Sequence, residues 1–264
     1  MLQISQLIIY PIKSLGGISL DRAQVTDRGF QHDRRWMLVN EDNGFITQRT
    51  VPSMALIHVA VGVNGLHVTS RLHASALFVP LDNRLPEFAD VYIWEDTCKA
   101  QFVSHEADAW FTAALQIPCR LVYMPDTTAR ATDPEYAPEG SITSFADAFP
   151  FLLIGQASLD ELNSRLELAL PMDRFRPNIV FTGGSPYQED ELKEFSVRDI
   201  RFRGVKLCAR CPIPTIDQAT AERGKEPLRT LARYRSWNNK VYFGQNLIHQ
   251  GMGEIAVGDL ILVS

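Results

Sequence analysis

The 264-residue sequence has few cysteines, no long apolar run and no excess of basic residues. Four cysteines in a chain of this length do not form a disulfide framework, so a reducing compartment is the simpler interpretation. No stretch approaches the roughly 18 uninterrupted apolar residues of a membrane-spanning helix, and we expect no membrane span. Lys and Arg number 26 against 31 Asp and Glu, so the net charge of -5 argues against a surface that binds nucleic acid or anionic membrane as a whole.

The N-terminal segment MLQISQLIIYPIKSLGG also lacks the features of a secretory leader. It has no basic residues before its apolar run and no small-residue cleavage site, and the run ends at Pro11. We therefore interpret it as part of the mature protein. The 45% hydrophobic composition is typical of a chain with a real core that folds alone.

The first half of the chain predicts a β-barrel or compact sheet. It consists mainly of short runs rich in β-branched and aromatic residues, separated by turn signals. Asn64-Gly65 lies between alternating β-branched residues and predicts a hairpin with a type I′ turn, because both residues tolerate a positive φ. Residues 105–117 place apolar side chains at helical spacing, which predicts one helix packed on the sheet before a strand at 119–124.

The second half predicts further strands and two helices. Residues 125–150 hold four of the fifteen prolines and form either a domain boundary or a functional loop. Ser158 and Glu161 are spaced as a capping box for a helix over 158–170, and a short helix is expected within 226–235. Gly204 separates two strand-like runs and predicts a hairpin turn. The expected fold class is mainly β with some α.

The segment KLCARCPIPTID, residues 206–217, carries Cys208 and Cys211 and permits four interpretations. A zinc site needs a second ligand pair at short spacing, and the sequence supplies none. A redox dithiol needs a helix N-terminus, whereas the prolines make this segment extended. The cysteines could be buried and inert. Arg210 and Lys206 instead favour a thiolate, which is the soft ligand that a redox-active transition metal prefers.

Several cationic positions are candidate anion sites. In YPIKSLGG, Lys13 and Ser14 precede two glycines, where exposed N–H groups and a hydroxyl can surround a phosphate. Arg176 is followed by Pro177 at the start of a strand, a rigid position from which to present a guanidinium. Each of these motifs is weak by itself. Further candidates are Arg34, Arg35, Arg174 and Arg210.

The motifs become specific through their order along the chain. They are YPIKSLGG, DRRWMLV, FADAFPFLLIGQASLDELNSRL, FRPNIV, CARC before TID, EPLRTLARYR, and FGQNLI followed by VGD. Together they resemble the MOSC-domain family with an N-terminal MOSC β-barrel domain, which includes amidoxime-reducing components and bacterial reductases of N-hydroxylated bases. The resemblance runs from about Ile8 to the C-terminus. It implies an N-terminal MOSC β-barrel domain over 1–120 and a MOSC β-barrel domain over 121–264.

The resemblance further implies a molybdenum cofactor (Mo-molybdopterin) bound between the two domains. The family's metal ligand and catalytic cysteine corresponds to Cys211, which leaves Cys208 an auxiliary role. Relatives commonly have a serine where this chain has Ala209, so a hydroxyl contact is lost there although a backbone contact remains possible. The implied cofactor contacts are Lys13, Ser14, Arg34, Arg176, Asn178, Ala209, Arg210, Gln245 and Asn246.

The activity implied is reduction of N-hydroxylated compounds: amidoximes, hydroxylamines and N-hydroxylated bases. Electrons are expected from a separate ferredoxin-like or reductase partner, because no cysteine-rich cluster site is present. The anchoring segment of the mitochondrial relatives is absent, so a cytoplasmic protein is expected. Asp217 and His249 are both candidate proton donors. The alternative is a non-catalytic cofactor carrier or sulfur-transfer module. We expect structural roles for Cys98, Cys119, His58, His67 and His73.

Overall fold

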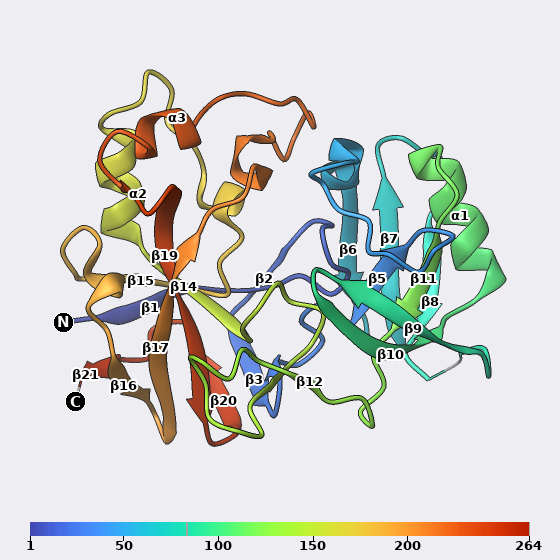
Figure 1. Cartoon of the computed structure of the whole chain (residues 1–264), viewed down its shortest axis with the longest axis horizontal. Coiled ribbons are helices and arrows are strands. Elements are labelled where there is room, and N and C mark those ends of the chain that lie inside the picture. Colours follow the sequence, from blue (N-terminus) through green and yellow to red (C-terminus); the bar gives the residue numbers. More distant parts are fainter. Residues whose placement is uncertain (83, 264) are drawn as a thin grey trace.

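In the computed structural model, which describes residues 1–82 and 84–263, the chain is rich in strands and has few helices (Figure 1). The expected class, mainly β with some α, is confirmed. Figure 1 shows α1 (His105–Leu115) with the first-half strands on one side, and α2 (Gln156–Asn163) and α3 (Leu228–Leu231) beside the largest sheet on the other. No helix in the described residues has the length and apolar character that crossing a membrane requires.

The largest sheet combines strands from both ends of the chain. Among the described residues, its only parallel pair is β14 with β15, and Phe151, Phe181 and Phe202 are buried in its core. Short β18 (Ser236–Trp237) pairs with β19 beside the main order. That order is β2 (Ile18–Leu20), β1 (Gln3–Ile9), β15 (Ile179–Thr182), β14 (Phe151–Gly155), β19 (Lys240–Gln250), β17 (Ile200–Ala209), β16 (Glu194–Val197) and β21 (Leu262–Val263).

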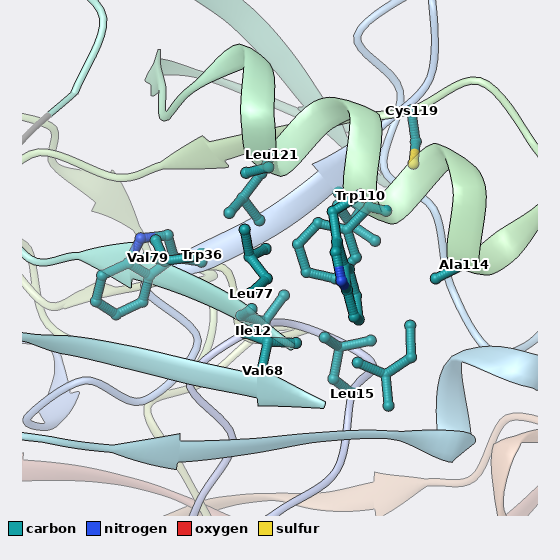
Figure 2. Packing of buried hydrophobic residues seen from close by; sticks show 14 of the residues in the cluster. Ile12, Leu15, Trp36, Val68, Leu77, Val79, Trp110, Ala114, Cys119 and Leu121 are labelled. Atoms are coloured by element: carbon teal, nitrogen blue, oxygen red, sulfur yellow. The ribbon is translucent and has the colours of Figure 1, made fainter. Parts of the chain in front are cut away.

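The first half forms two smaller sheets around a separate core. Ser104 caps α1 by accepting a 3.1 Å hydrogen bond from the N–H of Ala107, and the helix ends before Gln116, whose φ is 56°. Figure 2 shows Trp110 directed from α1 towards the strands that carry Val68 and Leu77. The sheets are β5 (Trp36–Val39), β11 (Arg120–Tyr123), β10 (Asp96–Phe102) and β9 (Phe88–Ile93), and β6 (Ile57–Val61), β7 (Gly65–Ser70) and β8 (Leu77–Pro80).

The remaining strands and helices are short. They include β3 (Arg22–Thr26), β4 (Gly29–Phe30) and β20 (Gly253–Ala256) in one small sheet, the pair β12 (Arg130–Ala131) and β13 (Ile142–Thr143), and the 3-10 helices η1 (Pro52–Leu56), η2 (Met172–Phe175), η3 (Gln188–Asp190) and η4 (Ile213–Thr215).

The first 30 residues pair with strands of the second half. β1 is antiparallel to β15, and β3 is antiparallel to β20. A division of the chain at residue 120 therefore separates strands from their hydrogen-bonding partners. The domain bounds 1–120 and 121–264 stay a prediction.

The hairpin predicted at Asn64-Gly65 is present, but the predicted type I′ turn is wrong. β6 and β7 pair antiparallel up to Val61 opposite Leu66, and neither Asn64 nor Gly65 has a positive φ. Gly65 instead begins β7, where a Cβ atom would clash with the ring of Phe78. The glycine is needed there for close packing and not for turn geometry.

The hairpin turn predicted at Gly204 is wrong. Gly204 lies inside β17, and the strand turns before it, near Arg198, whose φ is 51°. A Cβ at Gly204 would lie 2.5 Å from Nε2 of Gln245 and would clash with the carbonyl of Leu192. The glycine permits close contact between neighbouring strands, a use that sequence alone does not distinguish from a turn.

The capping box predicted at Ser158 is also wrong. α2 begins at Gln156 after Gly155 and ends at Asn163, so Ser158 lies inside the helix. Its hydroxyl donates a 2.7 Å hydrogen bond to the buried carboxyl of Glu189 and accepts one from the N–H of Tyr187. The serine therefore joins α2 to η3. The short helix expected within 226–235 is present as α3.

Glu189 should make the folding stability depend on pH. Burial raises its pKa from 4.5 to about 7, so its protonated form stabilises the folded state fully below about pH 4.5, and this contribution is lost as the pH rises through 7. We expect Glu189→Gln to raise the free energy of unfolding at pH 8 by about 2 kcal/mol and to flatten its decline between pH 5 and 8. Urea unfolding measures both, with exposed Glu191→Gln as control. Equal slopes in Glu189→Gln and wild type would contradict the assignment.

Candidate functional site

A cavity of about 420 Å³ lies where the two halves of the chain meet. Its lining includes nine of the ten predicted cofactor or metal contacts, namely Lys13, Ser14, Arg34, Arg176, Asn178, Ala209, Arg210, Cys211 and Asn246. The segment 125–150, ambiguous in the sequence, contributes residues 146–149 to the wall. Positions separated by up to about 230 residues in sequence thus share one cavity.

The cysteine segment enters the cavity from the end of β17. Ala209 is the last strand residue and pairs with Tyr242 of β19. The Arg210 N–H donates to the carbonyl of Val241 at 2.7 Å, and Pro212 then precedes η4. Cys208 and Cys211 are both unpaired and half-buried. The extended backbone followed by prolines holds the segment on a rigid element.

Both cysteines line the cavity, and Cys208 has additional contacts. Cys208 packs at the edge of a hydrophobic cluster, and burial raises the pKa of its thiol although the guanidinium of Arg210 lies 3.2 Å from its Sγ. The sequence-based expectation that Arg210 lowers a thiol pKa therefore fails at Cys208, because desolvation outweighs the charge. Arg210 also donates to the carbonyl of Phe175 at 2.8 Å, while its Nε is buried without a partner among the described residues.

Lys13 and Ser14 are the lining residues that the N-terminal segment contributes. Both are buried, and Ser14 has a left-handed backbone with φ 68°. The Lys13 amine donates to the carbonyl of Phe145 at 2.7 Å and to the carboxylate of Asp147 at 2.6 Å. Burial lowers the pKa of Lys13, and Asp147 opposes that shift. The lysine is thus fixed in place by the loop that also contributes residues 146–149 to the lining.

Arg34 and Arg176 lie against the ring of Tyr10. Their guanidinium carbons are 4.4 and 4.1 Å from the ring centroid. Arg34 is paired with buried Asp33 and donates to Oδ1 of Asn178 at 3.0 Å. Arg176 has no carboxylate within salt-bridge distance in the described part of the chain, and burial lowers its pKa to about 10. A buried cation without a counter-ion is costly, so this position favours binding of an anion.

The two β19 candidates differ in position. Asn246 lines the cavity and donates to the carbonyl of Lys206 at 3.0 Å. Gln245 is fully buried and is not part of the lining, and neither of its amide atoms has a hydrogen-bond partner among the residues described. The structure therefore does not bring Gln245 together with the other nine.

The candidate proton donors lie outside the cavity lining. Asp217 contacts Arg174 at 3.3 Å; burial acts to raise its pKa, but the N–H groups of Ala219 and Thr220 lower it below the ordinary value. His249 pairs with the carbonyl of Thr26 at 2.7 Å beside a separate hollow, and burial lowers its pKa.

The other cysteines and histidines lie away from the cavity. Cys98 and Cys119 are buried in hydrophobic clusters, where burial raises the pKa of each thiol to about 11. Within residues 1–82 and 84–263, no group of three or more His, Cys, Asp or Glu side chains is arranged to hold a metal ion. The three histidines expected to be structural do not line the cavity: His58, His67 and His73.

Several residues that line the cavity were not predicted as site residues from the sequence. Arg49 and Trp94 line the cavity, and the Arg49 guanidinium carbon lies 3.8 Å from the centroid of the Trp94 ring. Asp147 and Lys240 line it as well. Asp147 lies within the motif FADAFPFLLIGQASLDELNSRL but is not among the predicted site residues, and Arg49, Trp94 and Lys240 lie outside the recognised motifs. Arg49, Trp94 and Lys240 lie at the ends of predicted strands, and their only signal is charge or aromatic character, which many surface residues share.

Comparison with known proteins identifies the family of the chain. Residues 1–118 match the model of the MOSC N-terminal beta barrel domain, and residues 141–262 match that of the MOSC domain. The mitochondrial amidoxime-reducing component 1 of Homo sapiens is 32% identical over 97% of this chain and 81% of that protein, and its Mus musculus counterpart is 30% identical over 97% and 80%. A molybdenum cofactor sulfurase of Oryza sativa is 30% identical over 96% of this chain but only 33% of its own length. The chain belongs to the MOSC-domain family that carries an N-terminal MOSC β-barrel domain.

Proposed function

We propose that the protein is a molybdenum-dependent oxidoreductase that reduces N-hydroxylated compounds such as amidoximes, hydroxylamines and N-hydroxylated bases. The observation that carries the proposal is a half-buried cysteine, Cys211, in a cavity whose charged lining residues are mainly cationic. The relatives named amidoxime-reducing components support it, since they match this chain over nearly its whole length.

The lining suits an anionic, phosphate-bearing pterin. Six cationic side chains and one carboxylate, Asp147, line the cavity of a protein whose net charge is -5. The buried Nε of Arg210 has no partner in the described residues, and Arg176 lacks a carboxylate, so both retain capacity for a ligand oxygen. The proposed contacts are Lys13, Ser14, Arg34, Arg176, Asn178, Ala209, Arg210 and Asn246.

Gln245 fits this proposal less directly. Its buried amide has unsatisfied atoms but is separated from the lining. We propose that Gln245 packs against Gly204 within the sheet and does not contact the pterin itself.

The proposed roles of the chain's own residues follow from their positions. The bound cofactor would supply two-electron redox chemistry, with the Cys211 thiolate as a protein ligand of the metal. Reduction converts N–OH, two electrons and two protons to N–H and water. The cations orient the pterin, and the rigid end of β17 fixes Cys211. We propose that the electrons come from a separate ferredoxin-like or reductase protein.

A non-catalytic cofactor carrier or sulfur-transfer module is the second candidate. The sulfurase match favours it, although this chain spans about a third of that protein. Metal analysis and an activity assay separate the candidates. Protein from a molybdate-replete host should contain molybdenum near stoichiometric level and, once chemically reduced, should convert benzamidoxime to benzamidine. Molybdenum without turnover would favour the carrier, and zinc at that level would overturn both.

A further inference from the structure

Trp94 occupies a backbone position that disfavours a large side chain. Ile93 of β9 pairs with Asp96 of β10, so Trp94 and Glu95 form a two-residue hairpin loop. Trp94 has a φ of 55°, in the left-handed region that glycine or asparagine adopts at lower cost. The side chain does not compensate by burial, because 49% of the residue is exposed. A strained, half-exposed tryptophan is best explained by a role other than stability.

The same side chain lines the cavity that contains Cys211. The Arg49 guanidinium covers part of its ring at 3.8 Å, and Phe45 lies at 5.4 Å between ring centroids with a tilt of 58°. These neighbours fix the orientation of the indole. Its exposed remainder is available to a flat ligand that enters the cavity.

Charge around Trp94 limits which ligands can approach. Arg49 and Lys240 line the cavity with Trp94, and Asp147, the single carboxylate of the lining, is already paired with Lys13. A cationic ligand would be repelled by this set, whereas a neutral or anionic one would not.

We propose that Trp94 is a specificity-determining residue that stacks the ring of flat, uncharged aromatic N-hydroxylated substrates at the mouth of the Cys211 cavity. This inference rests on the proposed reductase function and adds a discrimination between aromatic and small aliphatic substrates. Stacking on an aromatic side chain favours any planar π system, so arylamidoximes and N-hydroxylated bases are both accepted.

The test compares substrates on the cofactor-loaded protein. Trp94→Gly should raise the KM for benzamidoxime roughly tenfold, change its kcat by less than about twofold, and leave the kcat/KM for acetamidoxime nearly unchanged. Trp94→Phe should restore most of the lost affinity. Trp237→Ala, which removes a half-exposed tryptophan outside the cavity lining, should behave as wild type.

Two measurements without turnover complete the test. Calorimetric titration of the unreduced protein with benzamidoxime should show roughly tenfold weaker binding in Trp94→Gly than in wild type. The unfolding temperature of Trp94→Gly should stay equal or rise, because glycine relieves the positive φ. A lower unfolding temperature, equal binding by both proteins, or equal losses for both substrates would overturn the role of Trp94. If wild type binds benzamidoxime but reduces neither substrate, the reductase function fails while the binding comparison still decides the stacking.

Discussion

Cys211→Ala is expected to reduce benzamidoxime turnover to background, a loss of more than about a hundredfold, because it removes the proposed thiolate ligand of the metal. Cys208→Ala should keep activity within about threefold, since Cys208 lines the cavity but packs at the edge of a hydrophobic cluster and is not the proposed metal ligand. The measurement is the turnover of chemically reduced protein, normalised to its molybdenum content.

The two cysteines serve as matched controls, because both are half-buried and lie three positions apart. The pterin content of the Cys208→Ala and Cys211→Ala proteins should be similar, because Lys13, Arg34 and Arg176 remain in both. The fluorescence of the oxidised pterin measures this content. If Cys208→Ala abolishes turnover and Cys211→Ala does not, the ligand assignment is reversed.

Arg176→Met is expected to lower the affinity for the cofactor about a hundredfold, because the charge-assisted hydrogen bonds proposed for its guanidinium are lost. The same change should raise the free energy of unfolding of the cofactor-free protein by about 1 kcal/mol. Burial lowers the pKa of Arg176 to about 10, so a cation without a carboxylate partner destabilises the folded protein. Pterin content and urea unfolding measure the two effects.

Arg201→Met is the control for this experiment. Arg201 is an exposed cation on β17 that does not line the Cys211 cavity. Its replacement should change neither pterin content nor stability appreciably. A cofactor-free Arg176→Met protein that is less stable than wild type would show that the arginine serves the fold and not an anion.

Most of the cavity could be predicted from the sequence because its residues lie in ordered local motifs. Lys13 and Ser14, Arg176 and Asn178, and Arg210 and Cys211 are short-range pairs, and the structure brings all three pairs to one cavity. Trp94 and Arg49 could not be found this way. Their contact depends on the meeting of the β9–β10 hairpin with a loop about 45 residues earlier, and no local pattern encodes that meeting.

The errors in the fold have a common physical origin. Gly204 and Gly65 resemble turn residues, but at each position a neighbouring segment of the same chain leaves no room for a Cβ atom. Ser158 resembles a helix cap, but its hydroxyl bonds to Glu189, which is 31 positions away. In each case a tertiary contact determines the residue type, and local propensity cannot reveal which contact that is.

The pairing of β1 with β15 has a consequence for biosynthesis. Gln3 lies opposite Thr182, so β1 leaves the ribosome about 180 residues before the strand with which it pairs. At ordinary translation rates this delay is on the order of ten to forty seconds. During that time an apolar strand exposes unpaired backbone groups, which is the state that chaperones recognise and that aggregation exploits. We therefore expect β1 of the nascent chain to depend on chaperones until β15 has been synthesised.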